Sequence, residues 1–245
     1  TKKANQIKKS LYRANHIISS SNYTLDLINN MNITEIKKSI IPPTYSLKAI
    51  DENNIFKQPT KKVSILSITR LEERKGIIPV LKSLGYLHKE KLIKPFIWKI
   101  CGEGDQENEI KNYIDNLGLS KHVRLLGRVS NETKNQLLKK ADLFVMPSYK
   151  VRNSIEGFGI SYIEAASYGV PSISGVEGGI SDAVFNMKTG WCVNPLNSNL
   201  LSEVIKEAVN NKNIREKFGL EAKKQFLKKF LGEKVFRKFM NTINS

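Results

Sequence analysis

Cysteine and histidine are scarce in this chain, which has two cysteines and three histidines. Cys101 and Cys192 each lie in an apolar, strand-like stretch, so we interpret them as small core residues of a protein in a reducing compartment. His16, His88 and His122 are scattered along the chain and show no metal-ligand spacing. The sequence therefore predicts neither a disulfide nor a metal site built from these side chains.

Long apolar runs are also lacking, because no hydrophobic stretch reaches the length of a membrane span. No internal repeat or low-complexity tract appears. Hydrophobic residues still make up 40% of the 245 positions, which is enough for one sizeable core or two small ones. The chain begins with Thr1 and not with Met, so we expect a fragment of a longer protein. These features predict a soluble, cytoplasmic α/β protein.

Acidic residues are outnumbered by basic ones, 23 against 40, which gives a net charge of +17. The excess lies at the ends: residues 1–62 hold eleven basic and four acidic residues, and residues 200–245 hold eleven and five. Two interpretations stay open, a lysine-rich compositional bias and peripheral contact with an anionic membrane, where each near-surface cation contributes about 1 kcal/mol. No nucleic-acid partner is expected, because neither interleaved aromatic residues nor a recognised binding motif accompanies the charge.

Apolar, strand-like runs alternate with helix-like segments beyond residue 62, which predicts a doubly wound parallel sheet covered on both faces. The expected strands are 63–68, 95–101, 122–125, 143–146, 171–174 and 190–193. The expected helices are 74–90, 105–117, 130–140, 160–168, one beginning at 198, and a lysine-rich stretch over 212–243. Before them we expect helix 2–13, strand 15–20, helix 22–30 and strand 39–41. Gly118 and Gly169 fall where helix C-caps belong.

One of these strand–helix–strand units, spanning residues 143–174, carries polar chemistry at the carboxyl end of its first strand. Glu156 precedes a Gly-x-Gly turn, Gly157 to Gly159, and Glu164 follows two helical turns later. Ligands of open α/β sheets bind at this edge. The glycines allow close approach of a ligand, and a helix that begins near Ile160 favours a phosphate at its N-terminus. The alternative is that both glutamates are solvated surface acids.

The stretch EGFGISYIEAASYGVP, with seven residues between its two glutamates, resembles the signature of the retaining, GT-B-fold glycosyltransferases of family 4, the glycosyl transferases group 1. Further blocks are similar and occur in the same order: SITRLEERKG (67–76), WKICGEGDQENEI (98–110), VRLLGRVSNET (123–133), VEGGISDAV (176–184) and TGWCVNP (189–195). The resemblance covers residues 14 to about 240. Two departures are Ser181-Asp182, where Pro-Glu is common, and Gly-Glu-Gly at 102–104, where Gly-Asp-Gly or Gly-x-Gly is more usual.

The resemblance implies a role for each matching residue. Arg70 and Lys75 would stabilise the leaving diphosphate of a nucleotide sugar, Glu156 would hold the sugar hydroxyls, and Glu164 would hold the ribose. Backbone groups would complete the substrate site, around the diphosphate at Gly157, Phe158, Gly159 and Ile160, and around the base at Gly102, Glu103, Gly127, Arg128 and Val129. Neither a metal nor another cofactor is expected, because Glu103-Gly104-Asp105 is interpreted as a run of acids at a helix start. Retention in the family involves no obvious protein nucleophile, so Glu156 is not assigned that role.

The resemblance also implies a division of the chain into the C-terminal half of a two-domain GT-B enzyme. Residues 1–42 would be a remnant of the acceptor domain, 43–61 a linker, 62–228 a Rossmann-like nucleotide-sugar-binding domain, and 229–245 a helix that returns to the first domain. The expected activity is hexose transfer from a nucleotide diphosphate-sugar to a saccharide or lipid-linked acceptor with retention of configuration. The alternatives are a sugar-nucleotide epimerase of the same fold and a non-catalytic sugar-nucleotide-binding module.

Overall fold

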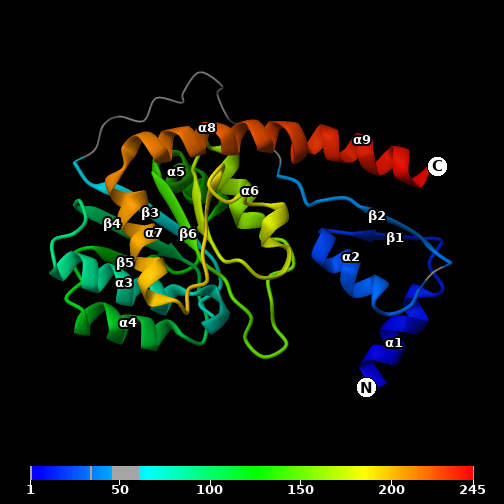
Figure 1. Ribbon diagram of the computed structural model, residues 1–245, viewed down its shortest axis with the longest axis horizontal. Helices are drawn as coiled ribbons and strands as arrows, with labels where there is room; N and C mark the ends of the chain where they lie inside the picture. The colour runs from blue at the N-terminus through cyan, green and yellow to red at the C-terminus, as the bar shows by residue number, and fades with distance from the viewer. Residues whose placement is uncertain (1, 34, 46–60, 245) are drawn as a thin grey trace.

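A computed structural model describes residues 2–33, 35–45 and 61–244 of the protein (Figure 1). Most of the linker predicted over 43–61 lies outside these residues. No helix in the described part of the chain is long and apolar enough to cross a membrane.

A six-stranded parallel sheet forms the centre of the molecule, as the alternating pattern predicts. Its strands are β3 (Val63–Ile68), β4 (Phe96–Cys101), β5 (Val123–Leu125), β6 (Leu143–Met146), β7 (Ser172–Ser174) and β8 (Gly190–Cys192). They are hydrogen-bonded in the order β5-β4-β3-β6-β7-β8, and every pair is parallel. The order reverses between β3 and β6, and in a doubly wound sheet the ligand crevice lies at that switch point. The fold is therefore a Rossmann-like α/β fold.

Helices cover both faces of the sheet (Figure 1). They are α3 (Ile77–Lys89), α4 (Glu107–Asn116), α5 (Asn131–Lys140), α6 (Ile160–Ser167), α7 (Ser198–Asn210), α8 (Lys212–Lys229) and α9 (Gly232–Ile243), with the short 3₁₀ helices η1 (Glu73–Lys75) and η2 (Gly178–Asp182). Side chains of Ser130, Asn197 and Asn211 cap three of these helices at their N-termini. The predicted C-cap glycines, Gly118 and Gly169, both adopt the left-handed conformation with φ 67°.

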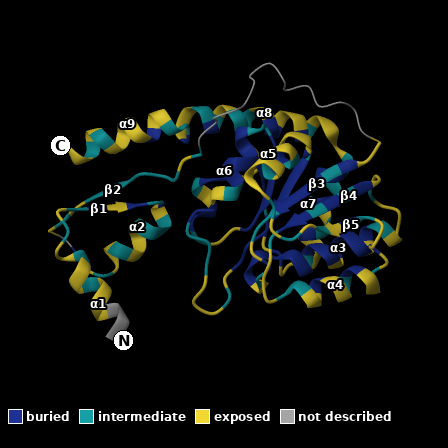
Figure 2. Ribbon diagram, turned by 180° about the vertical axis from the view of Figure 1, so that it is seen from behind, coloured by how far each residue is buried: buried dark blue, intermediate teal, exposed yellow. Residues whose placement is uncertain are grey.

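The core consists of two clusters, one on each face of the sheet. One joins the sheet to α3, α4 and α7, and it includes the fully buried Trp98 and Trp191. The other joins the sheet to α5, α6 and α8 and includes Tyr162 and Phe226. Figure 2 shows the buried residues gathered in the sheet and on the inner sides of these helices. Such two-sided burial is the reason why the strands appear in the sequence as continuous apolar runs.

The N-terminal elements form a small separate layer beside the sheet domain. They are α1 (Lys2–Leu11), β1 (His16–Ser19), α2 (Asn22–Asn29) and β2 (Lys37–Ile40), and β1 pairs with β2 in parallel. Figure 2 shows this layer as largely exposed or half-buried, although Ile17 and Ile33 are buried. The layer touches the sheet domain at the start of α2, where Ser21 contacts Gly157 and Asn22 contacts Asp182 of η2. The domain division inferred from the resemblance stays a prediction.

The lysine-rich helical stretch predicted over 212–243 consists of two helices, because the chain breaks between α8 and α9. Leu231 adopts an extended conformation (φ −64°, ψ 132°) and forms a bridge with Tyr45. The hydroxyl of Thr44 donates a hydrogen bond to the carbonyl of Phe230 at 2.7 Å. A contact from a distant segment therefore satisfies a backbone group that the helix would otherwise have used. The apolar periodicity of residues 212–243 does not indicate such a contact.

Candidate active site

The best candidate site lies where β3 and β6 end, at the switch point of the sheet. After β3 the chain enters η1, which carries Arg74 and Lys75, and after β6 a long loop leads to Glu156. The two segments are joined by a hydrogen bond from the amide of Tyr149 to the carbonyl of Arg74, 2.9 Å long. Gly76 allows them to approach closely: it has φ 73°, and a Cβ there would lie 2.4 Å from the carbonyl oxygen of Pro147. The fold therefore holds the basic turn against the loop of Glu156.

Glu156 is the centre of a half-buried ion cluster. Its Oε2 accepts hydrogen bonds from Lys75 Nζ at 2.5 Å and from Arg74 Nη1 at 3.2 Å. Arg74 Nε also donates to Glu72 Oε2 at 3.1 Å. The side chains of Arg74, Lys75 and Glu156 are only 10%, 9% and 15% exposed, so solvent screens these interactions weakly. Glu156 is thus not the solvated loop acid of the alternative interpretation.

The pKa values of the cluster reflect competition between burial and charge. Burial acts to raise the pKa of the Glu156 carboxyl, but Lys75 and Arg74 outweigh it and hold that pKa below its usual value. Burial lowers the pKa of the Lys75 ammonium, and the attraction of Glu156 offsets only part of this effect. Glu156 has two cations beside it, whereas Lys75 has Arg74 as a repelling neighbour, so the carboxylate gains more from the cluster than the ammonium does.

Arg70 lies at the open rim of this cluster. It follows β3 directly, its side chain is 70% exposed, and its Nη1 forms a 2.6 Å ion pair with Glu72. The structure therefore brings Lys75 to Glu156 but keeps Arg70 two links away, through Glu72 and Arg74. Arg74, which the sequence analysis did not select, occupies the inner position. Because Arg70 is exposed and lies just after the end of β3, it is accessible to an anion that approaches this edge of the sheet.

The glycine loop after Glu156 leads into α6. Gly159 is the N-cap residue with φ 91° and ψ 70°, and a Cβ there would lie 2.4 Å from the ring of Tyr162. The side chain of Phe158 is buried and meets Phe230 edge-on, with ring centroids 5.7 Å apart. Ile160 begins α6 and is half exposed at the loop surface. The contact of this loop's backbone with a ligand stays a prediction.

Glu164 lies on the second turn of α6 and is buried, with 8% of its surface exposed. Its Oε1 accepts a hydrogen bond from Lys134 Nζ on α5 at 2.7 Å. The Lys134 ammonium also lies over the ring of Tyr45, 5.4 Å from the centroid. Tyr45 is held by a 2.7 Å hydrogen bond to Asn135. The interpretation of Glu164 as an exposed surface acid is therefore wrong.

A second glycine turn follows β4 and lies against the segment that follows β3. The amide of Gly102 donates to the carbonyl of Gly127 at 2.8 Å, so the two predicted base-binding segments are adjacent. Gly102 has φ 134°, and a Cβ there would lie 1.8 Å from the carbonyl oxygen of Thr69. Glu103 and Arg128 form an exposed ion pair at 3.6 Å, and Val129 is partly buried beside them. The position of these segments at the edge of the sheet is compatible with a flat ligand that lies across it.

Glu103 and Asp105 do not cap a helix, which corrects the sequence-based interpretation. Helix α4 begins at Glu107, its N-cap is Gln106, and no side-chain cap is present. The acids in its first turn are Glu107 and Glu109. Within the described residues, no group of three or more His, Cys, Asp and Glu side chains could hold a metal ion.

Residues 50–225, more than half of the chain, match the family model described as glycosyl transferases group 1. The chain belongs to this family. Among curated relatives, an uncharacterised glycosyltransferase of Methanocaldococcus jannaschii is 34% identical over 57% of this chain and 38% of its own length. The amylovoran biosynthesis glycosyltransferase AmsK of Erwinia amylovora is 30% identical over 66% of this chain and 37% of its own. The matches thus span less than half the length of these relatives.

Solved structures agree with the fold of this member of the group 1 family. One is a crystal structure of a variant of S. aureus TarM in complex with fondaparinux, α-GlcNAc-glycerol and UDP. The superposition includes all of this chain and 47% of the TarM chain, with a TM-score of 0.82. Its sequence identity is 23%, so the likeness concerns the fold alone. The chain has the fold of GT-B glycosyltransferase structures.

Three residues of this group 1 chain are placed at the site although the sequence analysis did not name them as site residues: Arg74, Lys134 and Ser21. Arg74 adjoins Lys75 in the sequence, so its proximity to the site could have been inferred. Ser21 donates a hydrogen bond to the carbonyl of Gly157 at 2.7 Å, across 136 residues of sequence. Lys134 reaches Glu164 from the next helix, 30 residues away. No short-range pattern in the sequence points to the last two contacts.

Proposed function

We propose that this chain forms the donor-binding part of a retaining glycosyltransferase of family 4, which moves a hexose from a nucleotide diphosphate-sugar to a glycan or lipid-linked acceptor. The observation that carries the proposal is the cluster of Glu156, Lys75 and Arg74 at the switch point of the sheet. It combines a carboxylate, which can accept hydrogen bonds from sugar hydroxyls, with cations that can face a diphosphate. Fixed charge of this kind is usually the largest contribution to catalysis.

In the proposed reaction, the bond between the anomeric carbon and the diphosphate oxygen breaks while the acceptor oxygen bonds to the same face of that carbon. The bonding electrons leave with the diphosphate. Lys75 and the exposed Arg70 stabilise the negative charge that develops there, with the backbone amides around Gly157, Phe158 and Gly159. Arg74 is a positioning residue, because it contacts Glu156 and Glu72 and orients both. The acceptor hydroxyl passes its proton to an oxygen of the departing diphosphate as it forms the new bond.

The nucleoside part of the donor would occupy the neighbouring strand ends. Glu164 would accept hydrogen bonds from the ribose hydroxyls, with Lys134 holding its other side. The base would rest against backbone of Gly102 and Gly127, which the hydrogen bond between them brings side by side. Arg128 and Glu103 would border the base at the surface. Contact of the basic chain ends with a membrane, and a cytoplasmic location, stay predictions of the sequence.

The test of the proposed function is calorimetric titration of the chain with UDP, GDP and ADP and with the corresponding glucose and N-acetylglucosamine conjugates. Glu164→Gln is expected to weaken the free nucleotide and the sugar nucleotide alike, because both carry the ribose. Glu156→Gln is expected to weaken only the sugar nucleotide, by roughly 1–3 kcal/mol, since the bare diphosphate has no hydroxyl to offer it.

Equal losses for both ligands in both variants would contradict the division of roles, and failure of every nucleotide to bind would contradict the function itself. Conversion of the donor into its epimer without transfer would favour the epimerase alternative. Binding with neither reaction, in the whole natural protein, would favour the binding module.

A further inference from the structure

Three side chains from distant segments meet at α6, the helix that follows the glycine loop. Glu164 of α6 and Lys134 of α5 form a 2.7 Å ion pair, and their side chains are only 11% and 17% exposed. Tyr45, from the segment that follows β2, places its ring 5.4 Å from the Lys134 ammonium. Because solvent reaches this pair poorly, its charges interact more strongly than those of an exposed ion pair.

The two carboxylate oxygens of Glu164 have different surroundings. Oε1 accepts the hydrogen bond from Lys134 Nζ. Within the described residues, Oε2 accepts no hydrogen bond, and it is not one of the fully enclosed polar atoms that lack a partner. Oε2 therefore keeps contact with solvent while Oε1 is held. A carboxylate that is held through one oxygen can offer the other to a hydroxyl in a fixed direction.

Tyr45 holds the lysine in turn. A lysine has a flexible four-carbon stem, so one ion pair does not fix its ammonium, whereas an aromatic face within about 6 Å attracts it further. The ring is itself anchored, because its hydroxyl donates to Asn135 Oδ1 at 2.7 Å and its backbone forms a bridge with Leu231. Burial and the charge of Glu164 raise the pKa of the Tyr45 phenol, so it stays protonated and can donate this hydrogen bond.

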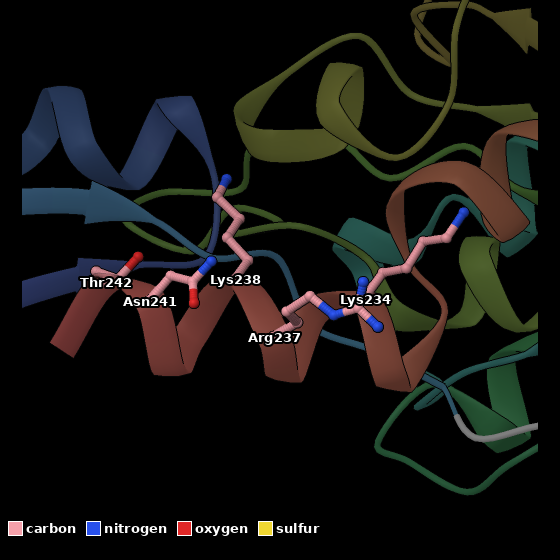
Figure 3. Close-up of a pocket in the computed structure, with 5 residues that line it drawn as sticks. All are labelled: Lys234, Arg237, Lys238, Asn241 and Thr242. Carbon is pink, nitrogen blue, oxygen red and sulfur yellow. The ribbon is translucent and has the colours of Figure 1, made fainter. Parts of the chain in front are cut away.

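This group is separate from the basic surface of α9. A hollow of about 480 Å³ lies along that helix and is lined by Lys234, Arg237, Lys238, Asn241 and Thr242 (Figure 3). Tyr45, Lys134 and Glu164 do not line it. Tyr45 instead packs against the core cluster that joins the sheet to α5, α6 and α8. The three side chains therefore belong to the interior edge of the sheet domain, where the nucleoside is expected.

We propose that Lys134 and Tyr45 are positioning residues for the ribose of the donor: Lys134 orients the Glu164 carboxylate, and Tyr45 orients Lys134. The inference rests on the proposed function, which assigns the ribose hydroxyls to Glu164. A ribose hydroxyl donates to Oε2 of Glu164, while the Lys134 ammonium on Oε1 keeps the carboxylate in this orientation. Tyr45 belongs to the segment between β2 and β3, so recognition of the ribose depends on where that segment lies.

The test compares each nucleotide with the form that lacks both ribose hydroxyls. UDP, GDP and ADP and their 2′,3′-dideoxy forms are titrated by calorimetry into the natural chain and into Lys134→Met, which removes the ammonium but keeps most of the stem. We expect the natural chain to prefer the ribose form at least about tenfold for the base that it accepts. Lys134→Met should bind the ribose form about tenfold more weakly and the dideoxy form within about twofold, because only the ribose form uses Glu164.

A second variant and two matched controls test the part of Tyr45. Tyr45→Leu should lose about threefold of the same preference, since it keeps the ion pair but removes the aromatic face. Lys82→Met and Tyr113→Leu are the controls, because Lys82 lies over the ring of Tyr113 at 5.0 Å, on helices that pack on the other face of the sheet. Both controls should bind the two forms within about twofold of the natural chain.

The outcomes separate this inference from the proposed function. Equal weakening of both forms in Lys134→Met would show a general loss of structure and overturn the inference, and so would an unchanged preference; the proposed function stands in either case. An unchanged preference in Tyr45→Leu overturns the part assigned to Tyr45. A natural chain that binds nucleotide without preferring the ribose form overturns the inference and the role of Glu164, but leaves nucleotide binding in place. Failure of all three nucleotides to bind contradicts the proposed function, and the inference with it.

Discussion

At the scale of single residues, the structure gives the two predicted cations, Arg70 and Lys75, different surroundings. The spacing of Arg70 and Lys75 correctly places both after β3, but a 3₁₀ turn rotates Lys75 and Arg74 inward and leaves Arg70 at the rim. Glu72 connects the two positions, because its two oxygens meet Arg70 and Arg74. Sequence alone does not decide which of two nearby arginines is buried, since this depends on how the turn packs against the loop after β6.

The exposed position of Arg70 leads to a prediction about phosphate binding. Arg70→Ala is expected to weaken UDP binding by roughly 1.5–3 kcal/mol, the contribution of a hydrogen bond to a charged group. The fold should remain intact, because the ion pair of Arg70 with Glu72 is largely exposed and contributes little to stability. Calorimetry of the folded variant measures the effect, and Arg124→Ala, an exposed arginine on β5, is the matched control. Unchanged UDP affinity in Arg70→Ala would remove this residue from the site.

At the scale of elements, the helix after the glycine loop shows how the site depends on backbone geometry. Gly159 and Gly118 both have a positive φ, 91° and 67°, but their surroundings differ. A Cβ at Gly118 would meet nothing within 4 Å, whereas one at Gly159 would overlap the ring of Tyr162. The hydroxyl of Tyr162 in turn donates to the carbonyl of Met146, at the end of β6. Tyr162 therefore joins the loop to the strand and cannot move freely.

This difference can be measured in a pair of alanine substitutions. Gly118→Ala is expected to lower the free energy of unfolding by about 1–2 kcal/mol, the strain of a left-handed alanine alone. Gly159→Ala should add steric overlap to this strain, for a loss of roughly 2–5 kcal/mol, together with weaker UDP binding. Urea denaturation of both variants gives the comparison. Equal losses of stability in the two variants would mean that the ring of Tyr162 moves away from the new methyl group without further loss of stability.

At the scale of the whole molecule, the central sheet could be predicted and the contacts around it could not. Strands such as β3 and β6 are continuous apolar runs, so the local sequence predicts their burial on both faces. The break between α8 and α9, the pairing of Lys134 with Glu164 and the docking of Ser21 on Gly157 each join distant segments. For the candidate site, the motifs locate the loop, both glutamates and Lys75, but the ionic partners Arg74 and Lys134 come from packing. Only the structure supplies those partners.

The docking of the N-terminal layer on the site loop leads to the last prediction. Asp182 accepts two hydrogen bonds from Asn22 at the start of α2, and Ser21 binds the carbonyl of Gly157 beside it. Asp182→Ala removes the first contact and leaves the backbone amide of Asn22 without its acceptor, so amide exchange in α2 and β1 should become about tenfold faster. Glu177→Ala is the matched control, because Glu177 lies just before η2 and its carboxylate accepts from the amide of Lys150 within the sheet domain. Exchange in β3 and β6 should stay unchanged in both variants, since the core of the sheet does not depend on this contact. If Asp182→Ala left the exchange of α2 unaltered, the N-terminal layer would be held by its other contacts, and Asn22 would have no part in fixing its position over the glycine loop.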